Sequence, residues 1–105
     1  MARFVSAIAQ GGAIDGTQVL TAASVDALTA VQVPDIDDDQ GLLGYRWDLD
    51  GDTVSGHNGE ETGTSTEVLY RHADGLVLVV LMNSLGRSRT LEHIELAMVD
   101  AAAGL

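Results

Sequence analysis

The sequence contains no cysteine and no lysine, one proline and only four aromatic residues. The absence of cysteine excludes a disulfide framework and a thiolate metal site, and it leaves the cellular compartment unassigned. The absence of lysine excludes any mechanism in which a lysine of this chain is the general base. No apolar run approaches the roughly 20 residues of a membrane span, so we expect no membrane insertion. No small-residue cleavage site follows the short apolar stretch of the first twelve residues, which predict a helix rather than a signal peptide.

Positive charge is scarce as well. Five arginines stand against 16 acidic residues, which gives a net charge of −11. Such a chain repels nucleic acid, so we expect a solvated acidic surface and no nucleic-acid partner. Two acidic stretches begin like calcium loops, but both lack the glycine and glutamate of an EF-hand at positions six and twelve. Gln40 and Arg46 stand there in the first, and Thr53 and Gly59 in the second. The sequence therefore predicts no metal site, and nothing in it implies a cofactor.

Apolar periodicity and turn signals predict one domain of 105 residues that contains helices and strands. Thr21 is suited to cap a short helix whose apolar face carries Val25 and Leu28. Asp50 and Gly51 form a strong tight-turn signal between two strands. The other predicted elements are helices over 2–10 and 88–103, strands over 41–49, 53–58, 64–71 and 76–82, a glycine-rich loop over 59–63 and a turn over 72–75.

The order of these elements predicts an α+β fold. Short turns join antiparallel neighbours, so about four strands form an antiparallel sheet with helices packed on it. The segment 76–82 is apolar throughout, which predicts a central strand buried on both faces. The first helix, with Phe4, Ala7 and Ile8 on one side, and the last helix would cover those faces. At least one edge of the sheet would stay exposed.

A search for a nucleophile finds six serines, none in a G-x-S-x-G turn and none beginning S-x-x-K. Without an activating base nearby, each serine is an ordinary hydroxyl, so we expect no complete nucleophilic machinery. His72 and His93 are predicted to be exposed on a turn and a helix. His57 remains, near the end of a strand and followed by Asn58 and Gly59. The pattern alone leaves two interpretations open: a hairpin histidine beside a flexible loop, or one wall of an active site.

Three segments that together span most of the chain carry a further signal when they are taken in order. They are RFVSAIAQGGAIDGTQVLTAASVDAL, LGYRW and GHNGEETGTSTEVLYRHADGLVLVVLMNS. Together they resemble the C-terminal part of the serine β-lactamase-like hydrolases, which include class C β-lactamases, DD-peptidases, D-aminopeptidases and related esterases. The resemblance implies that residues 1–105 form a single partial domain. That domain would be equivalent to the C-terminal portion of the family's α/β domain.

The resemblance also implies site residues. His57-Asn58-Gly59 looks like the H-x-G form of the family's third motif, which lies on the strand that lines the cleft. His57 would contact the substrate or the proton network. Asn58, Gly59 and Glu60 would bind substrate: Gly59 would give the backbone room, and the N–H of Glu60 would form half of an oxyanion hole.

The first two family motifs, S-x-x-K and Y-x-N, do not occur in this chain. The resemblance therefore implies a C-terminal fragment of an acyl-enzyme hydrolase that is inert alone. It would take small-molecule or peptide substrates (esters, β-lactams or D-amino-acid peptides) only together with a missing N-terminal part. The alternative belongs to another class: a stand-alone, non-catalytic α+β module that forms a homo-oligomer through its exposed sheet edge. A small acidic metal-binding domain is the third and weakest alternative.

Overall fold

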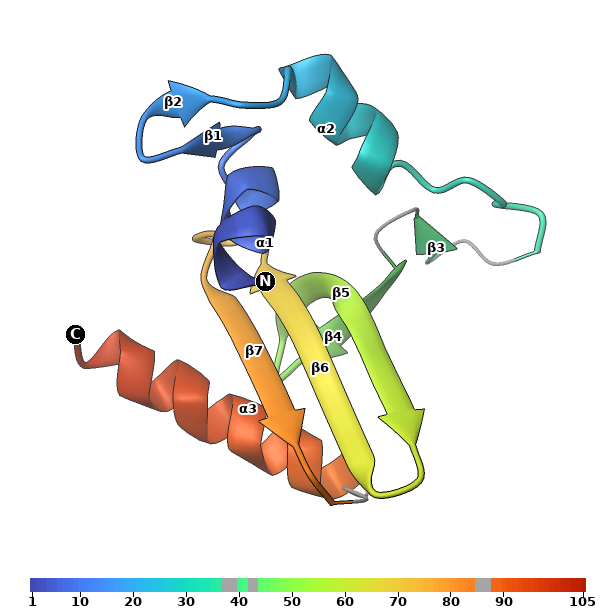
Figure 1. The fold of residues 1–105 in the computed structure, drawn as a ribbon, viewed down its shortest axis with the longest axis vertical. Helices are drawn as coiled ribbons and strands as arrows, with labels where there is room; N and C mark the ends of the chain where they lie inside the picture. The colour runs from blue at the N-terminus through green and yellow to red at the C-terminus, as the bar shows by residue number, and fades with distance from the viewer. Residues whose placement is uncertain (37–39, 42–43, 85–87) are drawn as a thin grey trace.

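The computed structural model describes residues 1–36, 40–41, 44–84 and 88–105. It has the predicted α+β architecture, with one main antiparallel sheet and helices packed on it (Figure 1). The elements are α1 (Ala2–Ala9), β1 (Ala13–Ile14), β2 (Thr17–Gln18), α2 (Ala22–Thr29), β3 (Gln40–Gly41), β4 (Gly44–Leu49), β5 (Asp52–Glu61), β6 (Thr64–Arg71), β7 (Val77–Met82) and α3 (Ser88–Ala103). None of the helices described in this chain is both long and apolar enough to cross a membrane.

The main sheet has the order β3-β4-β5-β6-β7, and every neighbouring pair is antiparallel. The prediction of about four strands is confirmed, with the two-residue β3 added at one edge. The Asp50-Gly51 turn is also confirmed: the φ angles of the two residues are +51° and +89°, the left-handed values that a two-residue hairpin loop requires. The sheet is thus a meander in which each strand pairs with the next.

The predicted loop over 59–63 is wrong for its first three residues. Strand β5 continues to Glu61, which pairs with Thr64, and Glu60 pairs with Ser65. The turn contains only Thr62 and Gly63, the latter with φ of +79°. The strand continues because the β-rich segment after the turn pairs with all three residues and offers backbone hydrogen bonds to Gly59 and Glu61, and this outweighs the low strand propensity of glycine and glutamate.

The prediction of a central strand over 76–82 is also wrong, since β7 lies at the edge of the sheet. Leu78 and Val80 are buried, but Leu81 is 76% exposed. The unbroken run of apolar residues in β7 therefore belongs to a strand with one buried face and one face that is only partly covered. The pattern could not separate this arrangement from burial on both faces.

Helices cover opposite faces of the sheet, as predicted. On one face, Leu69 and Leu78 belong to a core that also holds Leu96 and Met98 of α3. On the other face, Tyr70 packs with Ile8 of α1 in a second core, to which α2 contributes Val25. Alternation along β6 explains the division, because successive side chains point to opposite faces.

Two details of the N-terminal helices complete the comparison with the sequence. Thr21 caps α2 as predicted: its hydroxyl accepts a hydrogen bond from the Ser24 N–H at 3.1 Å. Ala7 and Ile8 are buried, but Phe4 is 50% exposed, so its predicted place on the buried face is wrong. The sheet lies on the side of α1 that carries Ala7 and Ile8, and the ring of Phe4 is left half in solvent.

Candidate functional site

Strand β5 extends beyond its neighbour β4. The two strands pair from Leu49 and Asp52 to Tyr45 and Gly56. Beyond Gly56, β5 continues over residues 57–61 and pairs with β6. In the part of the chain that the structure describes, no strand pairs with residues 57–61 on the side opposite β6. This run, which we call the open edge of β5, contains all four residues predicted to form a site.

The hydrogen-bonding phase of β5 determines which backbone groups face outward. The N–H of His72 donates to the carbonyl of Thr53 at 3.0 Å, which places an odd-numbered residue of β5 in a hydrogen-bonded pair with β6. In an antiparallel ladder such pairs alternate, so the even-numbered residues of β5 direct their N–H and C=O groups away from β6. Asn58 and Glu60 therefore present these groups at the open edge.

The side chain of His57 is exposed and lies beside the open edge. Its Nδ1 hydrogen-bonds to the backbone carbonyl of Asn58. A carbonyl can only accept, so the proton of the neutral imidazole is on Nδ1 and Nε2 is left as an acceptor. The ring centroid of Tyr45 lies 6.2 Å from that of His57. Nε2 is therefore the ring nitrogen that is not engaged with the Asn58 carbonyl.

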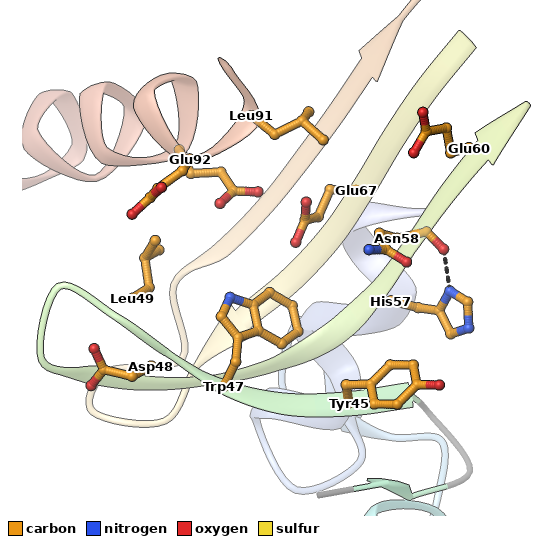
Figure 2. A pocket seen from close by; sticks show the side chains of 11 residues that line it. Tyr45, Trp47, Asp48, Leu49, His57, Asn58, Glu60, Glu67, Leu91 and Glu92 are labelled. Atoms are coloured by element: carbon orange, nitrogen blue, oxygen red, sulfur yellow. Dashed lines mark hydrogen bonds between the residues drawn. The ribbon is translucent and has the colours of Figure 1, made fainter. Parts of the chain in front are cut away.

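A cavity of about 420 Å³ lies along this region. Figure 2 shows Asn58 between His57, at the outer border of the sheet, and Glu67, which points toward α3. The lining residues come from β4, β5, β6 and α3: Tyr45, Trp47, Asp48, Leu49, His57, Asn58, Glu60, Glu67, Leu91, Glu92 and Glu95. The structure thus brings His57, Asn58 and Glu60 together on one cavity.

Gly59, the fourth predicted residue, does not line this cavity. A Cβ atom at this position would lie 2.9 Å from the hydroxyl oxygen of Thr66 on β6, too close for an ordinary contact. That hydroxyl donates to the Gly59 carbonyl at 3.3 Å. In this structure the glycine therefore makes room for the neighbouring strand.

One buried and one half-buried carboxyl group form the part of the cavity that sequence reasoning missed. Glu95 on α3 is only 3% exposed, and its carboxyl group hydrogen-bonds to that of Glu67 on β6. Burial, together with the charges of Glu67 and Glu92, raises the pKa of Glu95 to about 7. Burial also raises the pKa of Glu67, although the hydrogen bond from Glu95 opposes that rise. The two groups therefore share a proton near neutral pH.

Helical spacing could have identified Glu95. It follows Leu91 by four positions and precedes Met98 by three, so it lies on the apolar face of α3. Glu67 could be found in the same way, because it alternates with Ser65 and Leu69, both buried. A carboxylate at a core position on each of two packed elements is the signal that the sequence carried.

A serine and a histidine also meet outside the cavity. The Oγ of Ser55 lies 2.9 Å from Nε2 of His72, so the prediction that no serine has a base nearby is wrong for Ser55. His72 stacks on Tyr70, and burial and the charge of Arg46 lower its pKa. Among the described residues no carboxylate hydrogen-bonds to His72, and Arg46 disfavours the imidazolium that a triad would need to stabilise.

Within the described ranges, no group of three or more histidine or acidic side chains is placed to hold a metal ion. Residues 37–39 of the first acidic stretch lie outside those ranges. Comparison of the chain with protein-family models, with curated proteins and with solved structures finds no match in any of the three.

Proposed function

We propose that this chain forms one wall of an acyl-transfer cleft in a serine hydrolase of the β-lactamase-like type. The observation that carries the proposal is the open edge of β5, where His57 and two outward-facing backbone N–H groups border a cavity of about 420 Å³. A cavity of this size lies in the range that small-molecule sites occupy. The sequence resemblance centred on His57-Asn58-Gly59 supports the same assignment.

The geometry suits an acyl substrate that lies extended along the open edge. Its carbonyl oxygen would accept a hydrogen bond from the Glu60 N–H, which strengthens as negative charge develops on that oxygen. The acceptor at Nε2 of His57 would take part in proton transfer or bind a substrate hydroxyl or amide. The nucleophile and its base would come from a segment outside these residues, and the 105-residue chain would be inert alone.

Activity measurements on the isolated chain test this proposal. We expect no burst and no turnover with p-nitrophenyl acetate or nitrocefin, and no labelling by a fluorophosphonate probe. A protein that joins this chain to the residues encoded upstream should contain S-x-x-K and Y-x-N and should show a burst. In that protein, His57→Ala should lower kcat/KM by about 10²-fold or more, the range typical of a proton-transfer group.

Two results would overturn the proposal. One is an upstream reading frame with neither motif. The other is fluorophosphonate labelling of the isolated chain at Ser55, because this would assign nucleophilic chemistry to the Ser55–His72 pair instead. A Ser55→Ala variant separates specific labelling from background reaction.

A second candidate function, non-catalytic self-association, is favoured by the free edge of β7, the side opposite β6, where no other described strand pairs. The N–H of Arg71 donates to the carbonyl of Leu76 at 2.8 Å, which sets the phase of the β6–β7 ladder. The odd-numbered residues Val77, Val79 and Leu81 therefore direct their backbone groups away from β6. A second copy of the chain could pair with this edge, as edge strands are prone to do.

A further inference from the structure

The Glu67–Glu95 carboxyl pair faces the same cavity as His57, at the end formed by α3. We propose that this pair binds the primary ammonium or guanidinium group of a small organic molecule. The site would be selective for a cation with N–H donors and an apolar body. It does not depend on the hydrolase proposal, because neither carboxyl group takes part in the acyl-transfer geometry.

One oxygen atom of the carboxyl pair lacks a hydrogen bond within the described part of the chain. The Oε1 atom of Glu95 is buried and has no hydrogen-bond partner among the described residues, although Glu95 lines the cavity. A buried polar atom left without a partner destabilises the folded state, and the effect is larger for a charged group. This oxygen has almost no accessible surface, so the Glu95 side chain would turn toward the cavity to meet a donor there, and an ammonium or guanidinium group supplies several donors at once.

The cavity is lined by an excess of negative charge. Five acidic side chains line the cavity, and no arginine is among the lining residues. The ion pairs of the described residues lie elsewhere: Arg3 pairs with Asp15, and Arg71 pairs with Asp52 and Asp74. The carboxylates of the cavity thus have no positive partner from the described chain, and a cationic ligand would provide one.

Part of the cavity lining is apolar. Trp47, Leu49 and Leu91 stand beside the carboxyl groups, as Figure 2 shows for Glu67 and Glu92. An indole ring attracts organic cations and packs against methylene groups. A bare metal ion fits poorly, because no set of three acidic or histidine ligands is assembled among the described residues. The lining therefore favours an organic cation over a metal ion.

Proton release should accompany binding. Near neutral pH the pair shares a proton, whose place the cation would take, so the pair would release up to one proton. The ionisable groups that face Glu95 are Glu67 from β6 and Glu92 from α3, with Asp48, His57 and Glu60 further along the wall. All of the acidic ones disfavour a second negative charge, so binding should strengthen as pH rises through 7.

The single tryptophan of the chain lies in this cavity and serves as the reporter. Trp47 fluorescence and isothermal titration calorimetry would be followed while n-butylammonium chloride or n-butylguanidinium chloride is added at constant ionic strength. The neutral control is 1-butanol, which replaces the ammonium by a hydroxyl. We expect both cations to bind at least about tenfold more tightly than the alcohol, because only the cations form a charge-assisted hydrogen bond with the carboxyl pair. Calorimetry in two buffers of different ionisation enthalpy should reveal proton release.

Isosteric variants complete the test. Glu95→Gln and Glu67→Gln should each weaken binding of n-butylammonium about tenfold or more. Glu61→Gln, at the exposed end of β5 and outside the cavity, should bind as the unmodified chain does. Equal affinity for the cation and the alcohol would overturn the proposal, as would unchanged binding by a folded Glu95→Gln variant. An equal Trp47 response to calcium chloride would assign the pair to metal binding instead. The ligand comparison and the proton release use the unmodified chain, so the test stands even where a variant fails to fold.

Discussion

Glu95 occupies a position on α3 that an apolar residue would ordinarily fill. Its side chain is buried at the wall of the cavity between the helix and the sheet, and its carboxyl group is stabilised there by sharing a proton with Glu67. Ionising it places a charge in a poorly solvated position next to two other carboxylates. The folded state therefore favours the protonated form, and stability must depend on pH.

The sign of that dependence follows from the raised pKa of Glu95. Between about pH 4.5 and 7 the folded chain binds more protons than the unfolded chain, so the free energy of unfolding falls as pH rises through this window. Glu95→Gln should remove most of this slope and stabilise the chain at pH 8 by on the order of 2 kcal/mol. Urea unfolding at pH 5 and pH 8 measures it.

Glu92→Gln is the matched control for that measurement, because Glu92 is on the same helix but exposed. It should change the slope much less. Equal slopes in the unmodified chain and in Glu95→Gln would contradict the assignment of a shared proton.

At the acidic end, Arg71 and the Leu76 N–H lower the pKa of Asp74 to about 2, so that contribution to stability is lost only as pH falls toward 2.

The candidate site could be predicted from the sequence only in part. His57, Asn58 and Glu60 were identified by a motif that is contiguous in the chain, and the structure places them on one cavity. Their catalytic and substrate-binding roles stay predictions. Pairs that form only when distant elements pack, such as Glu67 with Glu95, are separated by many residues. A local motif cannot find them, although burial periodicity marks each member.

At the scale of elements, strand and helix identities followed from periodicity, whereas position within the sheet did not. The strand over 77–82 was found, but a run of apolar residues is the same for a central strand and for an edge strand with one half-covered face. The open edge of β5 was hidden for the opposite reason. Its glycine and two glutamates favour a loop locally, and only pairing with β6 extends the strand.

The free edge of β7 gives a prediction about association. Val79→Pro removes a backbone N–H that points away from β6, so the β6–β7 ladder is retained. If the edge mediates self-association, this variant should stay folded and monomeric at concentrations where the unmodified chain dimerises. Sedimentation velocity over a concentration series measures the difference.

Leu78→Pro is the control for the fold in this experiment. Its N–H faces β6, so this variant should lose about 3 kcal/mol or more of stability. Dimerisation of Val79→Pro as strong as that of the unmodified chain would exclude the β7 edge as the interface.

At the scale of the whole molecule, the structure is less compact than usual and carries a large excess of negative charge. The radius of gyration is 14.2 Å, against about 13 Å for a compact domain of this length. Within the described ranges, the outer edge of β7 and the open edge of β5 both have backbone groups with no strand beside them. An open form with a net charge of −11 is destabilised by its own repulsion.

Salt should therefore stabilise this chain. Raising sodium chloride from 20 mM to 500 mM shortens the screening length several-fold and weakens repulsion among the carboxylates. We expect the midpoint of thermal unfolding to rise by a few degrees, as measured by circular dichroism at pH 8. Sodium sulfate at equal ionic strength is the control for preferential exclusion of the salt. A fall in the midpoint with added sodium chloride would show that the arginine ion pairs outweigh the repulsion.

The meander order of the main sheet also bears on how quickly the molecule forms. Every strand pairs with its neighbour in sequence, and the β4–β5 and β5–β6 connections contain two residues each. Closing such short loops costs little chain entropy, and local contacts are associated with fast folding. The β4–β7 unit can therefore assemble as successive hairpins while the chain leaves the ribosome. Docking of α3 against this unit brings Glu95 and its proton beside Glu67.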